Sequence, residues 1–455
     1  MNSLPAEAPT ERSRSAEFIS WLCKALMGVF FREVEVKGRG RLPRGVPLLL
    51  VANHHNSLID PALLLAHLDV DPRFLAKSTL WDIPVMRQLL ELASVIPVYR
   101  RQDEGADTTR NQETFARCHE ELAAGGAIAL FPEGISHDAP HLAELKTGAA
   151  RIALEAEERF GPLGTWIIPV GLTFEEKGTF RSRALIRIGT PIDVSAWQAD
   201  QVRALTNAIR EGLAEVTLNY PSAEDVRAVE TAGDLIAGKE LELPSRMALD
   251  EAFAVRRDFI AAGERLRELF PERMRALQDR LESYAEELRR IGVRDDQVTA
   301  RYRKRDIGLY VLGSASLMLF WLPMALVGTL IHFLPYRLCG VVARFMKTED
   351  LPATMKLFSG FFLFPITWAL VAGAVWGAAG PWWAFFSLFV TPVTGFFALL
   401  FHERHEHFWS EIDAYLSLKL RRRSATRLRE EREALRTELH GLAELDQKET
   451  DPSSR

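Results

Sequence analysis

The sequence predicts an α/β fold with a mostly parallel sheet, followed by a helical accessory region and C-terminal transmembrane helices. Between residues 34 and 194, short apolar runs alternate with helical patterns, as in chains whose strands and helices alternate. Continuous apolar runs such as residues 48–51 suit strands that are buried on both faces. Further along, residues 307–334 and 357–401 are almost free of charge over lengths that exceed the needs of a soluble core.

Composition limits the function classes. A chain of 455 residues is long enough for two or three domains. Its 56 basic and 61 acidic residues give a net charge of −5, which argues against a nucleic-acid-binding protein. Cys23, Cys118 and Cys339 lie far apart, so neither a disulfide framework nor a zinc site is indicated. Nothing in the composition indicates an oligomeric state.

The N-terminal unit, residues 1–33, is expected to be an interfacial helix. Apolar residues follow helical spacing over about residues 16–31. This helix is shorter than the ~20 residues that cross a bilayer, so it is expected to lie in the interface or pack on the domain.

Residues 34–194 form the predicted α/β domain. The expected strands are residues 47–52, 73–76, 95–99, 127–131, 166–174 and 184–188. The expected helices between them include residues 61–68, 111–124 and 148–159.

The rest of the chain divides into three predicted parts. Residues 195–300 are polar and helical, residues 301–410 form the transmembrane region, and residues 411–455 form a charged helix with a solvated face and a tail. Basic clusters flank the transmembrane region on both sides, which favours two cytosolic ends and an even number of crossings. A break expected at residues 377–381 (GAAGP) divides residues 357–401 into two, so there are three apolar stretches. Three stretches fit an even number of crossings poorly, unless one is re-entrant or interfacial.

A histidine pair and an aspartate follow the first of these strands. A hydroxyl needs a base with a pKa near 7 to become a nucleophile, and a carboxylate that fixes the tautomer of the base. His54 or His55 with Asp60 supplies both. Alternatively, the histidines form a hydrogen-bonded loop pair, and Asp60 before Pro61 is a helix N-cap.

Four ordered blocks add weight to the catalytic interpretation. Residues 53–60 (NHHNSLID) resemble the first motif of the glycerolipid acyltransferase superfamily, PlsC-type, in which a histidine and an aspartate are catalytic. Residues 94–100 resemble the second motif, whose arginine is implicated in binding the acceptor phosphate. Residues 131–134 (FPEG) are similar to the third, and residues 168–170 resemble the fourth, an apolar strand near the acyl donor. The resemblance covers roughly residues 37–192.

The sequence departs from the family pattern at two places. The usual spacing of four residues between the histidine and the aspartate selects His55. In relatives with an Asn-His-Pro-Asn-Ser-Leu pattern, however, the catalytic histidine aligns with His54, and we favour His54 as the base. Many members continue the third block with Thr-Arg, but Ile135 and Ser136 follow here. The residues predicted to replace that arginine as phosphate ligands are Arg100, Arg101 and Lys146.

The resemblance implies a membrane-bound O-acyltransferase that moves an acyl group from acyl-CoA or acyl-carrier-protein to glycerol-3-phosphate or lysophosphatidic acid. Asn56, Ser57, Glu133 and Gly134 are implied on the substrate side, with Glu133 contacting acceptor hydroxyls. Backbone amides near Gly134 or in the first motif are expected to bind the oxyanion. No metal or other cofactor is expected, and the catalytic domain is expected on the cytoplasmic face of the membrane. The alternatives are a different lysolipid or alcohol acceptor, or a non-catalytic lipid-binding membrane organiser.

Overall fold

The computed structural model describes residues 14–100, 108–237, 247–299, 304–345 and 352–450. Contacts divide the chain into two compact units. The α/β unit comprises Met1–Asn219 and Met346–Thr354, and the helical unit comprises Tyr220–Phe345 and Met355–Arg455.

The α/β unit is built on one sheet, which has eight strands among the residues that the structure describes. Its strands are β1 (Glu33–Lys37), β2 (Leu48–Ala52), β3 (Pro72–Lys77), β4 (Ile96–Val98), β5 (Ala127–Leu130), β6 (Trp166–Phe174), β7 (Arg183–Ile188) and β8 (Ile192–Asp193). The order is β1-β7-β6-β2-β5-β3-β4, with β8 paired to β6. Only the pairings of β6 with β7 and β8 are antiparallel, so the predicted mostly parallel sheet is confirmed.

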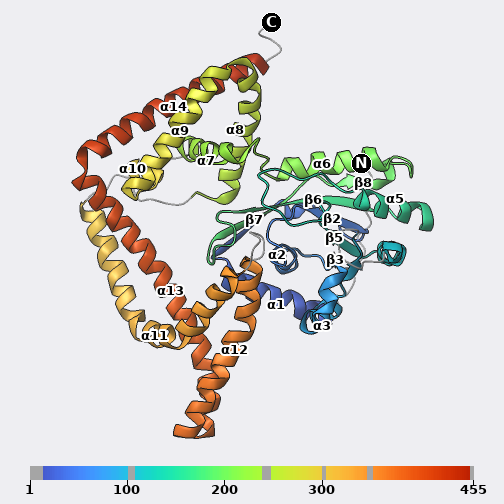
Figure 1. Cartoon of the computed structure of the whole chain (residues 1–455), viewed down its shortest axis with the longest axis horizontal. Helices are drawn as coiled ribbons and strands as arrows, with labels where there is room; N and C mark the ends of the chain where they lie inside the picture. The colour runs from blue at the N-terminus through green and yellow to red at the C-terminus, as the bar shows by residue number, and fades with distance from the viewer. Residues whose placement is uncertain (1–13, 101–107, 238–246, 300–303, 346–351, 451–455) are drawn as a thin grey trace. The chain divides into compact units, whose positions relative to one another are not determined.

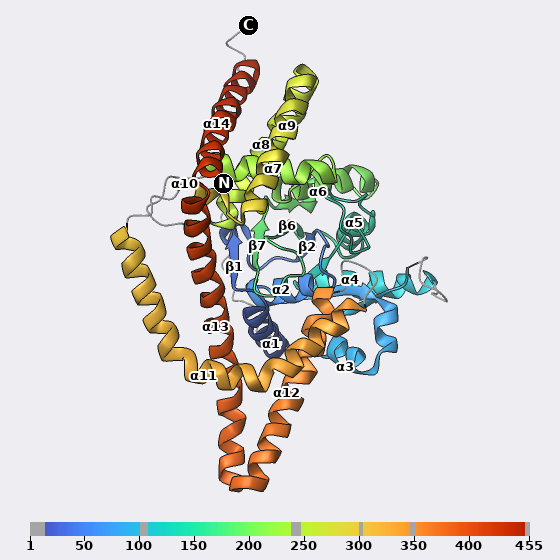
Figure 2. The same cartoon turned by 60° about the vertical axis from the view of Figure 1, so that its left-hand side comes forward.

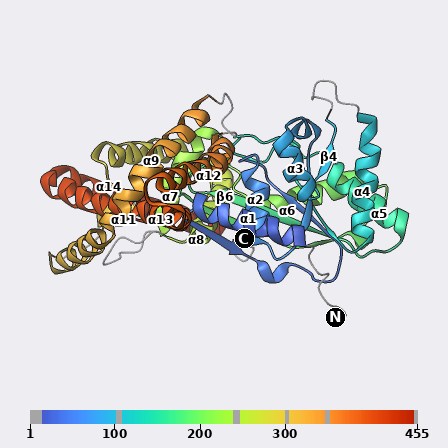
Figure 3. The ribbon, with the colours of Figure 1, turned by 90° about the horizontal axis from the view of Figure 1, so that it is seen from below.

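Helices cover both faces of this sheet. On one face lie α1 (Arg14–Phe30), α2 (Ile59–His67) and α3 (Pro84–Leu92), and α1 contacts both of the others (Figures 1 and 3). On the other face, α4 (Asn111–Ala123), α5 (Gly148–Phe160) and α6 (Val202–Val216) share a buried apolar core with β2 and β5. Because the central strands are covered on both sides, all five residues of β2 are buried.

The structure adds elements to those predicted and moves one boundary. All six predicted strands and the helices between them are present, but β1, β8 and α3 were not expected. The sequence predicts that residues 202–216 belong to the accessory region after residue 194. They form α6, whose Leu205, Ile209 and Leu213 are buried in the core beside the sheet. The N-terminal helix packs on the domain, with Met27 and Phe30 buried.

The helical unit contains a group of packed helices and three long apolar ones. Its shorter helices are α7 (Ala223–Ala237), α8 (Leu249–Leu269), α9 (Pro271–Ile291) and α10 (Asp295–Thr299). The charged helix α14 (Arg422–Thr450) joins their core through Leu428, Leu435 and Leu439, so it is not simply a solvated face as predicted. Arg432 on α14 is 1% exposed and binds Asp295 at 2.9 Å.

Three helices in the described residues are long and apolar enough to cross a membrane. They are α11 (Lys304–Arg344), α12 (Pro352–Ala379) and α13 (Pro381–Leu420). Figure 2 shows α11 crossing beside α13, with which it makes direct contacts. The predicted break lies at Gly380, between α12 and α13. The even number of crossings stays a prediction.

Candidate active site

Two neighbouring parallel strands bring the first and third sequence blocks together. β2 pairs with β5 in the register Leu48↔Ala127 to Val51↔Leu130. Their carboxyl ends therefore lie side by side, where open α/β sheets place their ligands. His54 follows β2 by two residues and Glu133 follows β5 by three, so both blocks lie at this edge of the sheet.

The loop after β2 is fixed at its start and then turns back. The Asn53 side chain donates to the carbonyl of Leu172 at 3.0 Å and accepts from the Leu172 amide at 2.7 Å. Ser57 has φ 44°, a left-handed conformation that reverses the chain. The helix α2 then begins at Ile59, which places Asp60 in its first turn, facing the loop. Asp60 is therefore not the N-cap that the sequence allowed, since that position belongs to Leu58.

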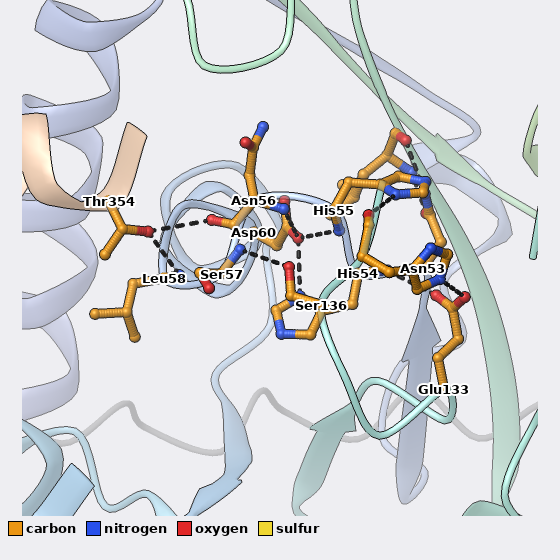
Figure 4. A network of polar contacts seen from close by, with 12 residues as sticks. Asn53, His54, His55, Asn56, Ser57, Leu58, Asp60, Glu133, Ser136 and Thr354 are labelled. Atoms are coloured by element: carbon orange, nitrogen blue, oxygen red, sulfur yellow. Dashed lines mark hydrogen bonds and ion pairs between the residues drawn. The ribbon is translucent and has the colours of Figure 1, made fainter. Parts of the chain in front are cut away.

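One oxygen of Asp60 organises the loop (Figure 4). Its Oδ2 accepts hydrogen bonds from the backbone amides of His55 and Asn56, both at 2.8 Å, and from the His54 ring at 2.9 Å. The Asp60 side chain is fully buried. A buried carboxylate with three donors on one oxygen has a fixed position, so it also fixes the ring that it binds.

His54 has the geometry of a general base. Because Asp60 can only accept, the His54 proton lies on Nδ1, which leaves Nε2 as an acceptor. No described residue donates to this Nε2, and the side chain is 18% exposed. The ring stacks on Phe131 with centroids 4.0 Å apart and an angle of 13° between planes. The ring is thus held from two sides with its basic nitrogen open.

His55 is placed differently. Its Nδ1 donates to the carbonyl of His137 at 3.0 Å, and only its backbone amide binds Asp60. Burial lowers the pKa of the His55 imidazole, which favours its neutral form. The carboxylate that would orient a base is therefore paired with the ring of His54 and not with that of His55.

Glu133 is buried, and its carboxylate binds backbone amides of two loops. Its Oε1 accepts from the His54 amide at 2.9 Å, and its Oε2 accepts from the Ala143 amide at 2.8 Å. His137 Nε2 also donates to Oε2. The residue is 2% exposed. Protein donors thus occupy both carboxylate oxygens, and the contact between Glu133 and acceptor hydroxyls stays a prediction.

Two of the predicted cationic residues meet at Gly134. Arg100 Nη1 donates to the Gly134 carbonyl at 3.1 Å. The exposed Lys146 passes over the same residue, with its Cγ 3.5 Å from where a Gly134 Cβ would lie. Gly134 has φ 75°, which glycine adopts without strain. Arg101, the third predicted cation, lies outside the described residues.

Asn56 and Ser57 contribute mainly to the shape of the loop. Asn56 is 1% exposed, which leaves little of it for a substrate to touch. The Ser57 amide donates to Ser136 Oγ at 3.2 Å. Thr354, which belongs to the α/β unit, accepts from the Leu58 amide at 3.2 Å. Ser136, His137 and Thr354 also belong to the site, although no sequence pattern marks loop residues that bind another loop.

The backbone amides of the base loop already have partners. Those of His54, His55 and Asn56 bind the two carboxylates, and Ser57 binds Ser136. The Gly134 amide binds the carbonyl of Phe131 at 3.0 Å. These amides, which we expected to hold an oxyanion, are therefore committed to the fold. The described residues also contain no group of His, Cys, Asp and Glu that could hold a metal ion.

Comparisons with known proteins give two family matches along the chain. Residues 33–173 match the family described as Acyltransferase, and residues 242–446 match the family described as Glycerol-3-phosphate acyltransferase 2 C-terminal domain. An uncharacterized acyltransferase of Schizosaccharomyces pombe is 23% identical over 458 residues, which cover 77% of this chain and 67% of the relative.

Two relatives that are named for an acceptor match shorter regions. Lyso-ornithine lipid O-acyltransferase of Brucella abortus is 30% identical over 231 residues, 44% of this chain and 81% of the relative. Glycerol-3-phosphate O-acyltransferase 2 of Saccharomyces cerevisiae is 31% identical over 147 residues, 30% of this chain. The match spans only 20% of that yeast enzyme. The resemblance predicted from the four sequence blocks is confirmed. The chain therefore belongs to the PlsC-type acyltransferase family and carries a C-terminal region of the glycerol-3-phosphate acyltransferase 2 type.

Proposed function

We propose that this protein is a membrane-bound O-acyltransferase that acylates a hydroxyl of glycerol-3-phosphate. The observation that carries the proposal is the 2.9 Å contact between His54 Nδ1 and Asp60 Oδ2, with the second ring nitrogen left open. This is the arrangement that a hydroxyl nucleophile requires from a neutral base.

The reaction would proceed by direct transfer. His54 Nε2 takes the proton of the acceptor hydroxyl while its oxygen attacks the carbonyl carbon of an acyl thioester. Asp60 stabilises the imidazolium that forms. When the tetrahedral intermediate collapses, the carbon–sulfur bond breaks, and the imidazolium returns its proton to the thiolate. The donor would be acyl-CoA or acyl-carrier-protein, with no metal and no covalent acyl-enzyme.

Two cations support a phosphate on the acceptor. Arg100 and the exposed Lys146 both lie at Gly134, on the same loop whose Glu133 binds the His54 backbone. Guanidinium and ammonium groups bind phosphate oxygens through charge-assisted hydrogen bonds. The C-terminal match to the glycerol-3-phosphate acyltransferase 2 family favours glycerol-3-phosphate over lysophosphatidic acid.

A second acceptor class has its own support. The Brucella abortus relative is named for a lyso-ornithine lipid, and it aligns over 81% of its length. A lysolipid without phosphate would not require the two cations at Gly134.

The test compares acceptors and variants in one assay. The full chain in phospholipid nanodiscs is incubated with radiolabelled palmitoyl-CoA, or with palmitoyl-carrier-protein, and with glycerol-3-phosphate, lysophosphatidic acid or lyso-ornithine lipid. We expect the highest kcat/KM with glycerol-3-phosphate and no product from His54→Ala. The exposed His141→Ala serves as a control and should retain wild-type activity. Absence of product with all three acceptors, or a His54→Ala variant as active as the wild type, would refute the proposal.

The cytoplasmic placement of the catalytic domain is a separate part of the proposal. Basic residues flank the apolar region at both ends, and each near-surface cation contributes about 1 kcal/mol of attraction to an anionic leaflet. The test is an Arg203→Cys variant treated with a membrane-impermeant maleimide. The cysteine should stay unlabelled in intact cells and react once the membrane is permeabilised.

A further inference from the structure

The loop that follows β5 runs beside the His54 loop and is hydrogen bonded to it. The His54 amide donates to Glu133, and the Ser57 amide donates to Ser136. In the reverse direction, the His137 amide donates to the carbonyl of His54 at 3.2 Å. The His55 ring completes the set through its bond to the His137 carbonyl. Residues 133–137 therefore fix residues 54–57 through contacts separate from those of Asp60.

His137 is the residue on which these contacts converge. Its Nδ1 accepts from the Ala139 amide at 3.1 Å, so its ring proton lies on Nε2, which donates to Glu133 Oε2. The His137 side chain is 13% exposed and that of Glu133 is fully buried. Both ring nitrogens are occupied within the protein. His137 is thus not available to exchange a proton with a substrate, but it is well placed to hold other groups.

We propose that His137 is a positioning residue for the acyl transfer, which acts through Glu133 on the backbone of His54 and through its own carbonyl on the ring of His55. The inference rests on the proposed function, because it assigns the base to His54. It also gives a role to the segment after Gly134, where many family members have Thr-Arg. In this chain that segment stabilises the base loop instead of presenting an arginine.

The physical reason is the sensitivity of proton transfer to distance. A base must lie within about 2.6–3.2 Å of the proton's donor atom, and a displacement of ~1 Å can cost about a hundredfold in rate. Without the His137 side chain, Glu133 Oε2 keeps only the Ala143 amide, and a buried carboxylate with a missing donor draws in water or moves. Because Glu133 holds the His54 amide, this movement displaces the base.

The expected effect is on kcat and not on substrate binding. His137→Ala should lower kcat about 10- to 100-fold, the usual range for residues that orient a functional group through another one. KM for both substrates should stay within about threefold, because His137 touches neither cation at Gly134.

His137→Gln tests the contact itself. A glutamine amide can donate to Glu133 in place of Nε2, so this variant should recover at least a third of the wild-type kcat. His141→Ala, an exposed histidine in the same loop, is the matched control and should be unchanged. Thermal midpoints show whether each variant folds. If His137→Ala does not fold, the kcat of His137→Gln tests whether the hydrogen bond to Glu133 is needed for acyl transfer.

A double-variant cycle with Glu133→Gln tests the route of the effect. If His137 acts through Glu133, the double variant Glu133→Gln/His137→Ala should be no slower than the slower single variant. Independent, multiplicative losses would overturn the inference. So would a wild-type kcat in His137→Ala, or a loss in His137→Gln equal to that in His137→Ala. If the wild type acylates an acceptor and His54→Ala does not, these results reject the role of His137 alone. If the wild type makes no product, the proposed function itself is refuted.

Discussion

Asp60 binds the ring of His54 across six positions of the chain, and it does so from the first turn of α2. The contact depends on the left-handed conformation of Ser57, which turns the loop back toward the helix. The same carboxylate oxygen holds the amides of His55 and Asn56. Base orientation and loop conformation are consequently set by one atom.

The two histidines should differ sharply when each is replaced. His54→Ala removes the ring paired with Asp60 and should lower kcat about 10²- to 10⁴-fold, the usual contribution of a general base. His55→Ala leaves that pair intact and should cost no more than about tenfold, as for a supporting group. Steady-state acyl transfer measures both. Equal losses in the two variants would contradict the assignment of the base.

Asp60→Asn should inactivate the protein without unfolding it. The asparagine oxygen can still accept from the amides of His55 and Asn56, so the loop can keep its shape. The negative charge that stabilises the imidazolium of His54 is lost, and kcat should fall about 10²- to 10⁴-fold. Circular dichroism spectra should match those of the wild type. A variant with normal kcat would show that Asp60 is structural only.

Lys146→Met should weaken phosphate binding selectively. Methionine keeps the aliphatic contact over Gly134 and removes the charge, so KM for a phosphorylated acceptor should rise about tenfold with kcat nearly unchanged. KM for lyso-ornithine lipid should not change. Arg203→Met, which removes an exposed cation on α6, is the control. A similar rise in KM for all acceptors would argue against a phosphate contact.

Gly171→Ala should destabilise the α/β unit. A Cβ at this position of β6 would lie 1.8 Å from the carbonyl oxygen of Val216, at the end of α6. The overlapping atom belongs to the backbone, so it cannot move aside as the end of a flexible side chain could. The free energy of unfolding should therefore fall by at least about 1–3 kcal/mol. Gly40→Ala, with no atom within 4 Å of its added Cβ, should be neutral. Thermal denaturation in detergent compares the two, and equal midpoints would contradict the prediction.

His119 should make stability depend on pH. Burial lowers the pKa of its imidazole below the usual 6.5, with Glu155 opposing this and Arg159 and Arg151 adding to it. The unfolded chain then binds more protons than the folded one, so stability falls as the pH drops below about 6.5. His119→Phe removes this proton uptake and two buried nitrogens that have no hydrogen-bond partner. Its thermal midpoint should change less between pH 7.5 and 5.5 than that of the wild type. An unchanged pH dependence would contradict the assignment.

The elements predicted from sequence are those with a strong apolar signal. The runs that became β2 and β5 are buried throughout, and such runs identify central strands directly. By contrast, β1 reads Glu-Val-Glu-Val-Lys at an edge of the sheet, where one neighbour and partial exposure leave little signal. The helix α6 is amphipathic and polar on one side, so its sequence resembles the accessory helices that follow. Only the tertiary contact with β6 assigns it to the α/β unit.

The residues that a base or a phosphate site requires could be predicted from the sequence. The hydrogen bonds between the loops that follow β2 and β5 could not. A histidine with Asp60 could be named because acid–base chemistry needs those side chains, whereas His54 and Arg100 were selected by the resemblance to the family motifs. Glu133 was identified, but its burial could not be, since nothing in the four letters FPEG shows which way the carboxylate points. His137 lies in a stretch without periodicity, and its contacts exist only after β2 and β5 have paired.

The length of α13 has a mechanical consequence. At about 1.5 Å per residue, its 40 residues extend roughly 60 Å, whereas the hydrocarbon layer is only about 30 Å thick. In a helix that crosses this layer, the apolar residues 381–401 would fill it, and the more polar residues His402 to Leu420 would project beyond it. A change in bilayer thickness changes the tilt of a spanning helix. Because a continuous helix is stiff, its projecting half would change direction together with its embedded half. For a spanning α13, a change in bilayer thickness would therefore change the direction of residues 402–420 outside the membrane.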